Sequence, residues 1–224
     1  REDGTWFLLL MSETGQPGRR KNPVIPTYMI DVFDRLDEQY GVSDYRETRR
    51  LAVDWIVRNP VTTFAWEAQF EDTRPKPSLR NLAYRAAAYT AKLLFKDPET
   101  VETAALILRF VEDQFVVWSP QDAVLWTNFF REGSGWNGND PVTGKDWFVP
   151  SATEQYAFFT PIAAATATVV ELYLAAFRRT GEPHFRQRAV ALANAIAAAQ
   201  QYHGNGEIPT HLRRTLPERS ERLL

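Results

Sequence analysis

The chain has 224 residues, 44% hydrophobic and 24% charged, which suits one globular domain that buries a core without disulfides or metals. Its 26 basic and 28 acidic residues give a net charge of −2, which removes the main electrostatic reason to expect a nucleic-acid or anionic membrane partner. Because cysteine is absent, a disulfide, a thiolate metal site and a cysteine nucleophile are excluded.

Apolar residues at helical spacing predict three helices in the first hundred residues. The first begins after Pro26 and stops at Gly41, since glycine commonly ends helices. Its apolar face comprises Tyr28, Val32, Phe33, Leu36 and Tyr40. The second is capped by Ser43 and ends before Pro60. Its face comprises Tyr45, Ala52, Trp55 and Ile56. A third helix is expected over about residues 78–95.

Proline and glycine mark three further helices in the rest of the chain. Asp97 and Pro98 open the fourth, as a cap followed by proline at the first helical position. Its stripe comprises Val101, Ala104, Ala105, Leu108, Val111 and Phe115. The fifth runs from Thr160-Pro161 to Gly181. The sixth starts at Pro183, and its face comprises Phe185, Ala189, Leu192 and Ile196.

The second, fourth and sixth helices repeat one pattern, which identifies each as the second arm of a hairpin. Aligning Gly41 with Gly181, for example, superimposes Ala52 on Leu192. The sequence therefore predicts one all-α domain of repeated helical hairpins over residues 1–224. The three hairpins are expected at about 26–58, 78–116 and 161–201. A plain helical bundle with coincidental spacing is the alternative.

Two long connections, Asn59–Pro77 and Val117–Thr160, each follow a second arm. In a hairpin array they therefore emerge on the same face, together with the terminal turns. Both are rich in aromatic residues, and long connections within compact domains are often functional. This face is the expected location of a functional site.

The first long connection concentrates acidic and polar residues beside a tryptophan. Candidate catalytic acids are Glu67, Glu71 and Asp72, and candidate substrate contacts are Trp66, Gln69 and Arg74. Crowded carboxylates can supply the acid and the base that glycoside cleavage needs, because one negative charge raises the pKa of its neighbour. The alternative is a surface turn in which Arg74 pairs with Glu71 or Asp72.

The second long connection combines tryptophans with turn-forming residues. Trp136 and Asn137 are candidates for a sugar platform and its polar contact, whereas other aromatic residues of this segment are expected to pack the loop onto the helices. Glu154 and Tyr156 precede the fifth helix and are candidates for a catalytic acid and a substrate contact, or else for a capping segment.

Glu112 and Asp113 lie near the end of the fourth helix, within its apolar stripe. Acidic groups there oppose the helix macrodipole, so a compensating reason is required. That reason is either a catalytic role or a turn that faces solvent.

The sequence indicates no metal or other cofactor. The three histidines, His184, His203 and His211, do not form the closely spaced HExxH pattern of a zinc site. No apolar run approaches the roughly 20 residues of a transmembrane helix, so no membrane partner is expected.

Three blocks of the sequence resemble the six-hairpin glycosidase superfamily, and in particular (α/α)-toroid proteins of bacterial polysaccharide metabolism. The blocks are Trp66–Asp72, Phe110–Phe115 and Glu154–Tyr156. The resemblance implies an (α/α)6 toroid whose active site is a cleft on one face, with glycoside hydrolase or polysaccharide lyase chemistry.

Three hairpins make only half of such a toroid, so the fold is expected to be incomplete or fragmentary. The turn Asp3–Trp6 resembles the turn Asn205–Ile208 that follows the last helix. If the two are equivalent, earlier hairpins precede Arg1; otherwise the protein is an incomplete arc.

The leading expectation is a glycoside hydrolase acting on an oligosaccharide or polysaccharide with paired carboxylates. One acid would come from the first long connection and the other from Glu112, Asp113 or Glu154. A lyase with Tyr156 as base and Arg74 or Asn137 as neutralising group is the nearest alternative, and a non-catalytic carbohydrate-binding scaffold is another. Such a substrate favours a periplasmic or extracellular location, although the chain contains no signal segment.

Overall fold

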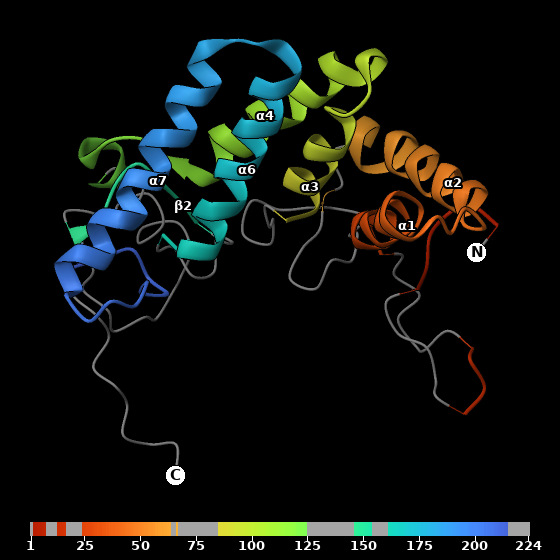
Figure 1. Cartoon of the computed structure of the whole chain (residues 1–224), viewed down its shortest axis with the longest axis horizontal. Coiled ribbons are helices and arrows are strands. Elements are labelled where there is room, and N and C mark those ends of the chain that lie inside the picture. The colour runs from red at the N-terminus through yellow and green to blue at the C-terminus, as the bar shows by residue number, and fades with distance from the viewer. Residues whose placement is uncertain are drawn as a thin grey trace. The chain divides into compact units, whose positions relative to one another are not determined.

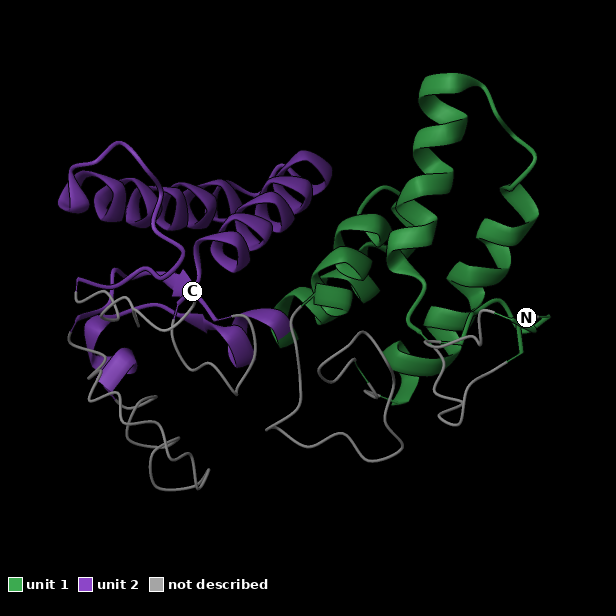
Figure 2. Cartoon of the chain, turned by 90° about the horizontal axis from the view of Figure 1, so that it is seen from below, with its two compact units in different colours: residues 1–110 green, residues 111–224 purple. Residues whose placement is uncertain are grey.

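The computed structural model describes residues 2–7, 13–16, 24–63, 66, 85–124, 146–153 and 161–214, which are mostly helical (Figure 1). The chain divides into two compact units, residues 1–110 and 111–224, which Figure 2 colours separately. The all-α prediction is confirmed at this level, whereas the toroid stays a prediction. None of the described helices is long and apolar enough to cross a membrane.

Helix α1 (Thr27–Tyr40) ends where the sequence predicts. Gly41 adopts a left-handed conformation with φ of 68°, and its amide donates to the carbonyl of Asp37 over 3.1 Å. The amide of Val42 donates to the carbonyl of Leu36 over 3.0 Å. These bonds satisfy carbonyls that the helix end leaves free, which is why glycine stops the helix here.

Helix α2 (Arg46–Ile56) starts later and continues further than predicted. Ser43 makes no side-chain cap; its carbonyl accepts from the amide of Arg46 over 3.2 Å. Beyond Ile56 the chain does not stop before Pro60 but passes through a π-helical turn, η1 (Val57–Val61), that contains it. Proline has no N–H to complete an α-helical ladder, and the side-chain Nδ2 of Asn59 partly replaces it by donating to the carbonyl of Trp55 over 2.7 Å.

The buried face of α1 is the predicted one only in part, at Phe33. Thr27, Ile30, Phe33 and Asp34 are buried, whereas Tyr28, Val32 and Tyr40 are exposed. The prediction considered apolar residues alone, so it missed that a charged residue, Asp34, faces inward. The inward position is possible because two cations reach the carboxylate of Asp34.

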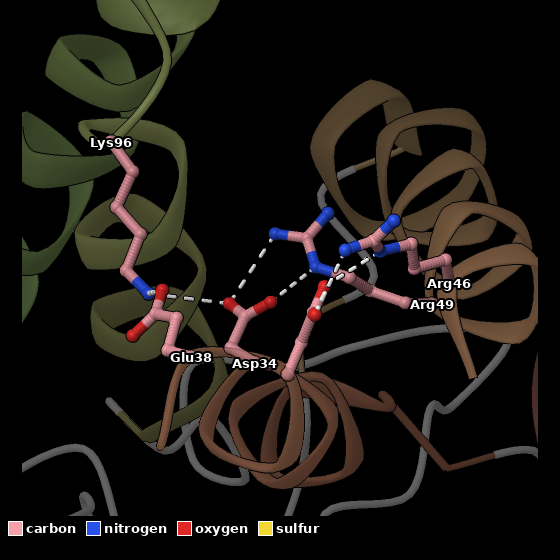
Figure 3. A network of polar contacts seen from close by, with 6 residues as sticks. Asp34, Glu38, Arg46, Arg49 and Lys96 are labelled. Carbon is pink, nitrogen blue, oxygen red and sulfur yellow. Dashed lines mark hydrogen bonds and ion pairs between the residues drawn. The ribbon is translucent and has the colours of Figure 1, made fainter. Parts of the chain in front are cut away.

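Asp34 is the centre of an ion-pair network in the first unit, drawn in Figure 3. Its side chain is only 9% exposed. Arg49 of α2 donates to both of its oxygens, and the ammonium of Lys96 lies 3.2 Å from Oδ2. Lys96 follows α3 (Arg85–Leu94), so one carboxylate connects α1 to α2 and to the end of α3.

A second pair in Figure 3 lies at the surface beside this network. The guanidinium of Arg46 donates to the carboxylate of Asp37 through two nitrogens, over 2.8 and 2.9 Å. The hydrogen bond from Arg46 lowers the pKa of Asp37 below its ordinary value. Because this pair is exposed to solvent, it contributes less to the packing of α1 on α2 than Asp34 does.

Helix α4 (Val101–Phe115) opens as predicted. Its start is a short 3-10 turn, η3 (Pro98–Thr100), in which the carboxylate of Asp97 accepts from the amide of Glu99 over 2.9 Å. The predicted stripe is largely confirmed, since Ala104, Leu108, Val111 and Phe115 are buried. The boundary between the two units falls within this helix, after Phe110.

Helices α6 (Ala163–Thr180) and α7 (Pro183–His203) form the hairpin of the second unit, side by side and antiparallel in Figure 1. Gly181 makes the turn with φ of 72°, and Pro183 is the first residue of α7, both as predicted. Small residues fill the buried faces, including Ala165, Ala176 and Ala189. Alanine lets the two helix backbones approach closely, so the hairpin packs along much of its length.

A small sheet, which the sequence does not predict, joins the ends of the second long connection. Strand β1 (Val116–Val117) pairs antiparallel with β2 (Ser151–Ala152). Further backbone bridges join Thr153 to Pro161, Ile162 to His211 and Trp147 to Arg213. Because Pro161 and Ile162 belong to these bridges, α6 starts two residues after the predicted proline.

These bridges bring the base of the second long connection and the C-terminal turn to one end of the α6–α7 hairpin. The amide of Phe148 donates to the carbonyl of Leu212, and the amide of Leu212 donates to the carbonyl of Pro161, each over 2.9 Å. The shared face of the two long connections stays a prediction, because most residues of both connections lie outside the described ranges.

Removing the charge of Asp34 tests the network of the first unit. We expect Asp34→Asn to lower the free energy of unfolding by about 2–4 kcal/mol, because Arg49 and Lys96 lose their shared, nearly buried anion. Urea unfolding of the whole chain measures this change. Glu47→Gln is the matched control, since Glu47 pairs with Arg50 on the exposed side of α2 and should leave the midpoint nearly unchanged. Equal losses in both variants would contradict the central role of Asp34.

Candidate functional site

The described residues include three of the predicted site residues, namely Trp66, Glu112 and Asp113. The other predicted residues lie outside the described ranges. They are the candidate acids Glu67, Glu71, Asp72 and Glu154 and the candidate contacts Gln69, Arg74, Trp136, Asn137 and Tyr156. Glu112 and Asp113 are therefore the predicted acids whose surroundings the structure describes.

Trp66 does not present a platform to a sugar in this structure. Its side chain is 1% exposed, and its ring stacks on Phe110 with the centroids 6.2 Å apart. A sugar platform needs one free aromatic face, and both faces of a buried indole are covered. The position of Trp66 favours a role in the core of the first unit.

Glu112 and Asp113 are adjacent in sequence but lie in different environments. Asp113 is exposed, whereas the side chain of Glu112 is 15% exposed. Helical periodicity explains the difference, because Glu112 lies four residues after the buried Leu108, on the same face. The structure thus singles out Glu112 as the enclosed carboxylate of this pair.

Arg188 of α7 is the cation that accompanies Glu112. Its Nη1 lies 2.5 Å from both carboxylate oxygens, although 76 residues separate the two in sequence. The arginine side chain is 40% exposed, so the pair lies between the buried face of the helix and solvent. In this contact the carboxylate of Glu112 accepts hydrogen bonds from Arg188.

Two aromatic rings flank the guanidinium of Arg188. Its Cζ lies 5.2 Å from the ring centroid of Trp118 and 5.9 Å from that of Tyr173. The two rings meet edge to face, with the centroids 6.1 Å apart. Such cation–π contacts restrain the plane of a guanidinium. We name Glu112, Trp118, Tyr173 and Arg188 the Glu112 cluster.

Tyr173 carries a buried hydroxyl within this cluster. Among the described residues, its Oη has no hydrogen-bond partner of acceptable geometry. Burial raises the pKa of Tyr173 far above its ordinary value; the negative charge of Glu112 adds to the increase, while Arg188 acts in the opposite direction. At neutral pH the phenol is therefore protonated and available as a hydrogen-bond donor.

Trp118, Tyr173 and Arg188 were not among the predicted site residues, although the position of Arg188 carried a signal. Phe185, Arg188, Ala189 and Leu192 share one face of α7, so an arginine lies on its apolar face. Glu112 has the equivalent place on α4. Two opposite charges on apolar faces predict an ion pair, because an unpaired buried charge is costly.

Within the described ranges, no group of three or more histidine, aspartate and glutamate side chains is arranged to hold a metal ion. The cluster has one carboxylate, which alone is too few ligands for a protein metal site. Its chemistry is that of an anion, a fixed cation and a protonated phenol.

Comparison with known proteins adds no relative: no protein family, no curated protein and no solved structure matches this chain. The resemblance to the six-hairpin glycosidases therefore stays a prediction from the sequence blocks.

The buried phenol predicts a specific dependence of stability on alkaline pH. Unfolded Tyr173 ionises near its ordinary pKa of about 10, whereas the folded residue keeps its proton. The contribution of Tyr173 to the free energy of unfolding is therefore complete below about pH 10. Above that pH it decreases by up to about 1.4 kcal/mol per pH unit. Tyr173→Phe should show a shallower loss in urea unfolding at about pH 9–11.5. The control is Tyr202→Phe, since Tyr202 is 58% exposed. Parallel curves for wild type and Tyr173→Phe would contradict the assignment.

Proposed function

We propose that the protein is a carbohydrate-active enzyme, a glycoside hydrolase in which Glu112 is one of two working carboxylates. The observation that supports this proposal is a carboxylate fixed by an arginine next to two aromatic rings, Trp118 and Tyr173. Aromatic rings suit the apolar C–H faces of sugars, and a fixed carboxylate suits the stabilisation of an oxocarbenium-like transition state.

Glu112 is suited to act as the general base or the nucleophile rather than as the general acid. Its carboxylate is held in place by the ion pair with Arg188, which suits a group that accepts a proton from water or attacks the anomeric carbon. The general acid must then be a second carboxyl group. The separation of the two groups would decide the stereochemical outcome, at ~5–5.5 Å for retention or ~6.5–9.5 Å for inversion.

We assign Glu154 as that second carboxyl group. It is the residue after Thr153, and the amide of Thr153 donates to the carbonyl of Phe115 over 2.9 Å. Phe115 lies three residues after Glu112 on α4. Of the predicted acids beyond the described residues, Glu154 is the one that this connection favours.

The state of Tyr173 favours hydrolase over lyase chemistry at this cluster. A lyase needs a base that removes the proton next to a sugar carboxyl group, and a tyrosine serves only when it is deprotonated. The raised pKa of Tyr173 keeps it protonated, so it acts as a donor. The lyase alternative therefore depends on Tyr156, which lies outside the described residues.

The decisive experiment removes the charge of Glu112 and keeps its shape. We expect Glu112→Gln to lower kcat/KM by about 10²–10⁴ for a polysaccharide that the wild-type chain cleaves, as loss of a general base typically does. Release of reducing ends across a set of polysaccharides identifies that substrate. The ultraviolet absorbance of unsaturated products separates lyase from hydrolase activity. Glu102→Gln is the matched control, an exposed glutamate on the same helix that should retain wild-type activity.

Three outcomes would overturn this assignment. If Glu112→Gln folds, by circular dichroism, and keeps full activity, Glu112 has no catalytic role. If only Asp113→Asn loses activity, the role belongs to the neighbouring acid. A chain that binds polysaccharides but cleaves none would support the non-catalytic scaffold instead.

A further inference from the structure

Arg188 has hydrogen-bonding capacity that the described protein does not use. A guanidinium carries five N–H donors, and the ion pair with Glu112 occupies only Nη1. Among the described residues, the hydrogen bond and the ion pair of Arg188 both run from Nη1 to Glu112. Nε and Nη2 form one edge of the guanidinium, and 40% of the side chain is exposed.

Contacts within the protein restrain the orientation of that edge before any ligand binds. Glu112 holds one corner of the guanidinium, and the ring of Trp118 lies 5.2 Å from its centre. A free arginine loses much side-chain freedom when it binds a ligand, whereas a restrained planar group loses less. The free edge is therefore suited to specific binding more than an isolated surface arginine is.

The chemistry of the edge selects the ligand class. Two parallel N–H groups match the two oxygens of a planar carboxylate, which makes paired, charge-assisted hydrogen bonds. Glu112 already neutralises most of the charge of Arg188, and no other cation contacts the pair among the described residues. A singly charged carboxylate is therefore favoured over a dianionic phosphate, which the carboxylate of Glu112 would repel more strongly.

We propose that the Nε–Nη2 edge of Arg188 binds the carboxylate of an acidic sugar, such as a uronic acid residue, in the carbohydrate substrate. The inference rests on the proposed function, which it narrows from carbohydrates in general to acidic ones. Arg188 acts as a binding residue, and Trp118 is the positioning residue that holds its guanidinium.

The test compares an oligogalacturonate with the same oligomer after its carboxyl groups are reduced to alcohols, by calorimetric titration of the whole chain. We expect the wild type to bind the acidic oligomer about 10- to 100-fold more tightly, the range of a hydrogen bond to a charged group. Arg188→Lys keeps the charge beside Glu112 but loses the paired donors, so it should lose most of this preference. Arg186→Lys, on an exposed arginine of the same helix, is the matched control and should keep it.

Several results would overturn the inference. Equal binding of the two oligomers by the wild type does so without any variant, even if Arg188→Lys fails to fold. A preference that survives in folded Arg188→Lys, or equally tight binding of a sulfated neutral oligomer, also contradicts it. Failure of the proposed function is distinguishable, because it is read from cleavage by Glu112→Gln and not from this binding preference.

Discussion

In each unit, a charged side chain on the buried face of a helix joins elements that are far apart in sequence. Asp34 of α1 accepts from Arg49 of α2 and from Lys96 after α3. Glu112 of α4 accepts from Arg188 of α7. Because a buried charge without a counterion is strongly destabilising, each helix must hold its position for the pair to form. Apolar packing tolerates small rotations of a helix, but an ion pair of this kind does not.

The need to pair buried charges explains why the sequence predicts the ends of the helices better than their buried faces. Helix ends follow from local chemistry, so Gly41, Asp97, Gly181 and Pro183 lie where expected. Burial depends on the partners of a helix as well. The predicted face of α1 was correct only at Phe33, because Asp34 turns inward toward cations that the apolar pattern does not show.

The small sheet was missed for a different reason. Strands β1 and β2 have two residues each, which is too few for an alternating pattern. Their pairing joins Val116 to Ala152 and Val117 to Ser151, which are 36 and 34 residues apart in sequence. Nothing local in Val116–Val117 indicates a strand. The backbone partners become visible only once the ends of the second long connection are in place.

The candidate site was predictable in part. Glu112 was identified because an acid near a helix C-terminus opposes the macrodipole. Arg188 is equally unusual in the sequence, because it is a cation on the apolar face of α7. It was not predicted because only acids and aromatic residues were considered as candidates there. Trp66 shows the opposite error, because a tryptophan beside acidic residues was expected to face a substrate and lies instead in the core.

The Glu112 cluster carries features that stability alone does not require. A glutamate in the last turn of a helix costs about 0.3–1 kcal/mol through the macrodipole, and a buried hydroxyl without a partner costs about 1–3 kcal/mol. Arg188 offsets the first of these, but among the described residues nothing satisfies the hydroxyl of Tyr173. The cluster thus combines donors on Tyr173 and Arg188 with the carboxylate acceptor of Glu112. Sugar hydroxyl groups both donate and accept, and a sugar carboxylate accepts two parallel bonds, so an acidic carbohydrate complements each of these groups.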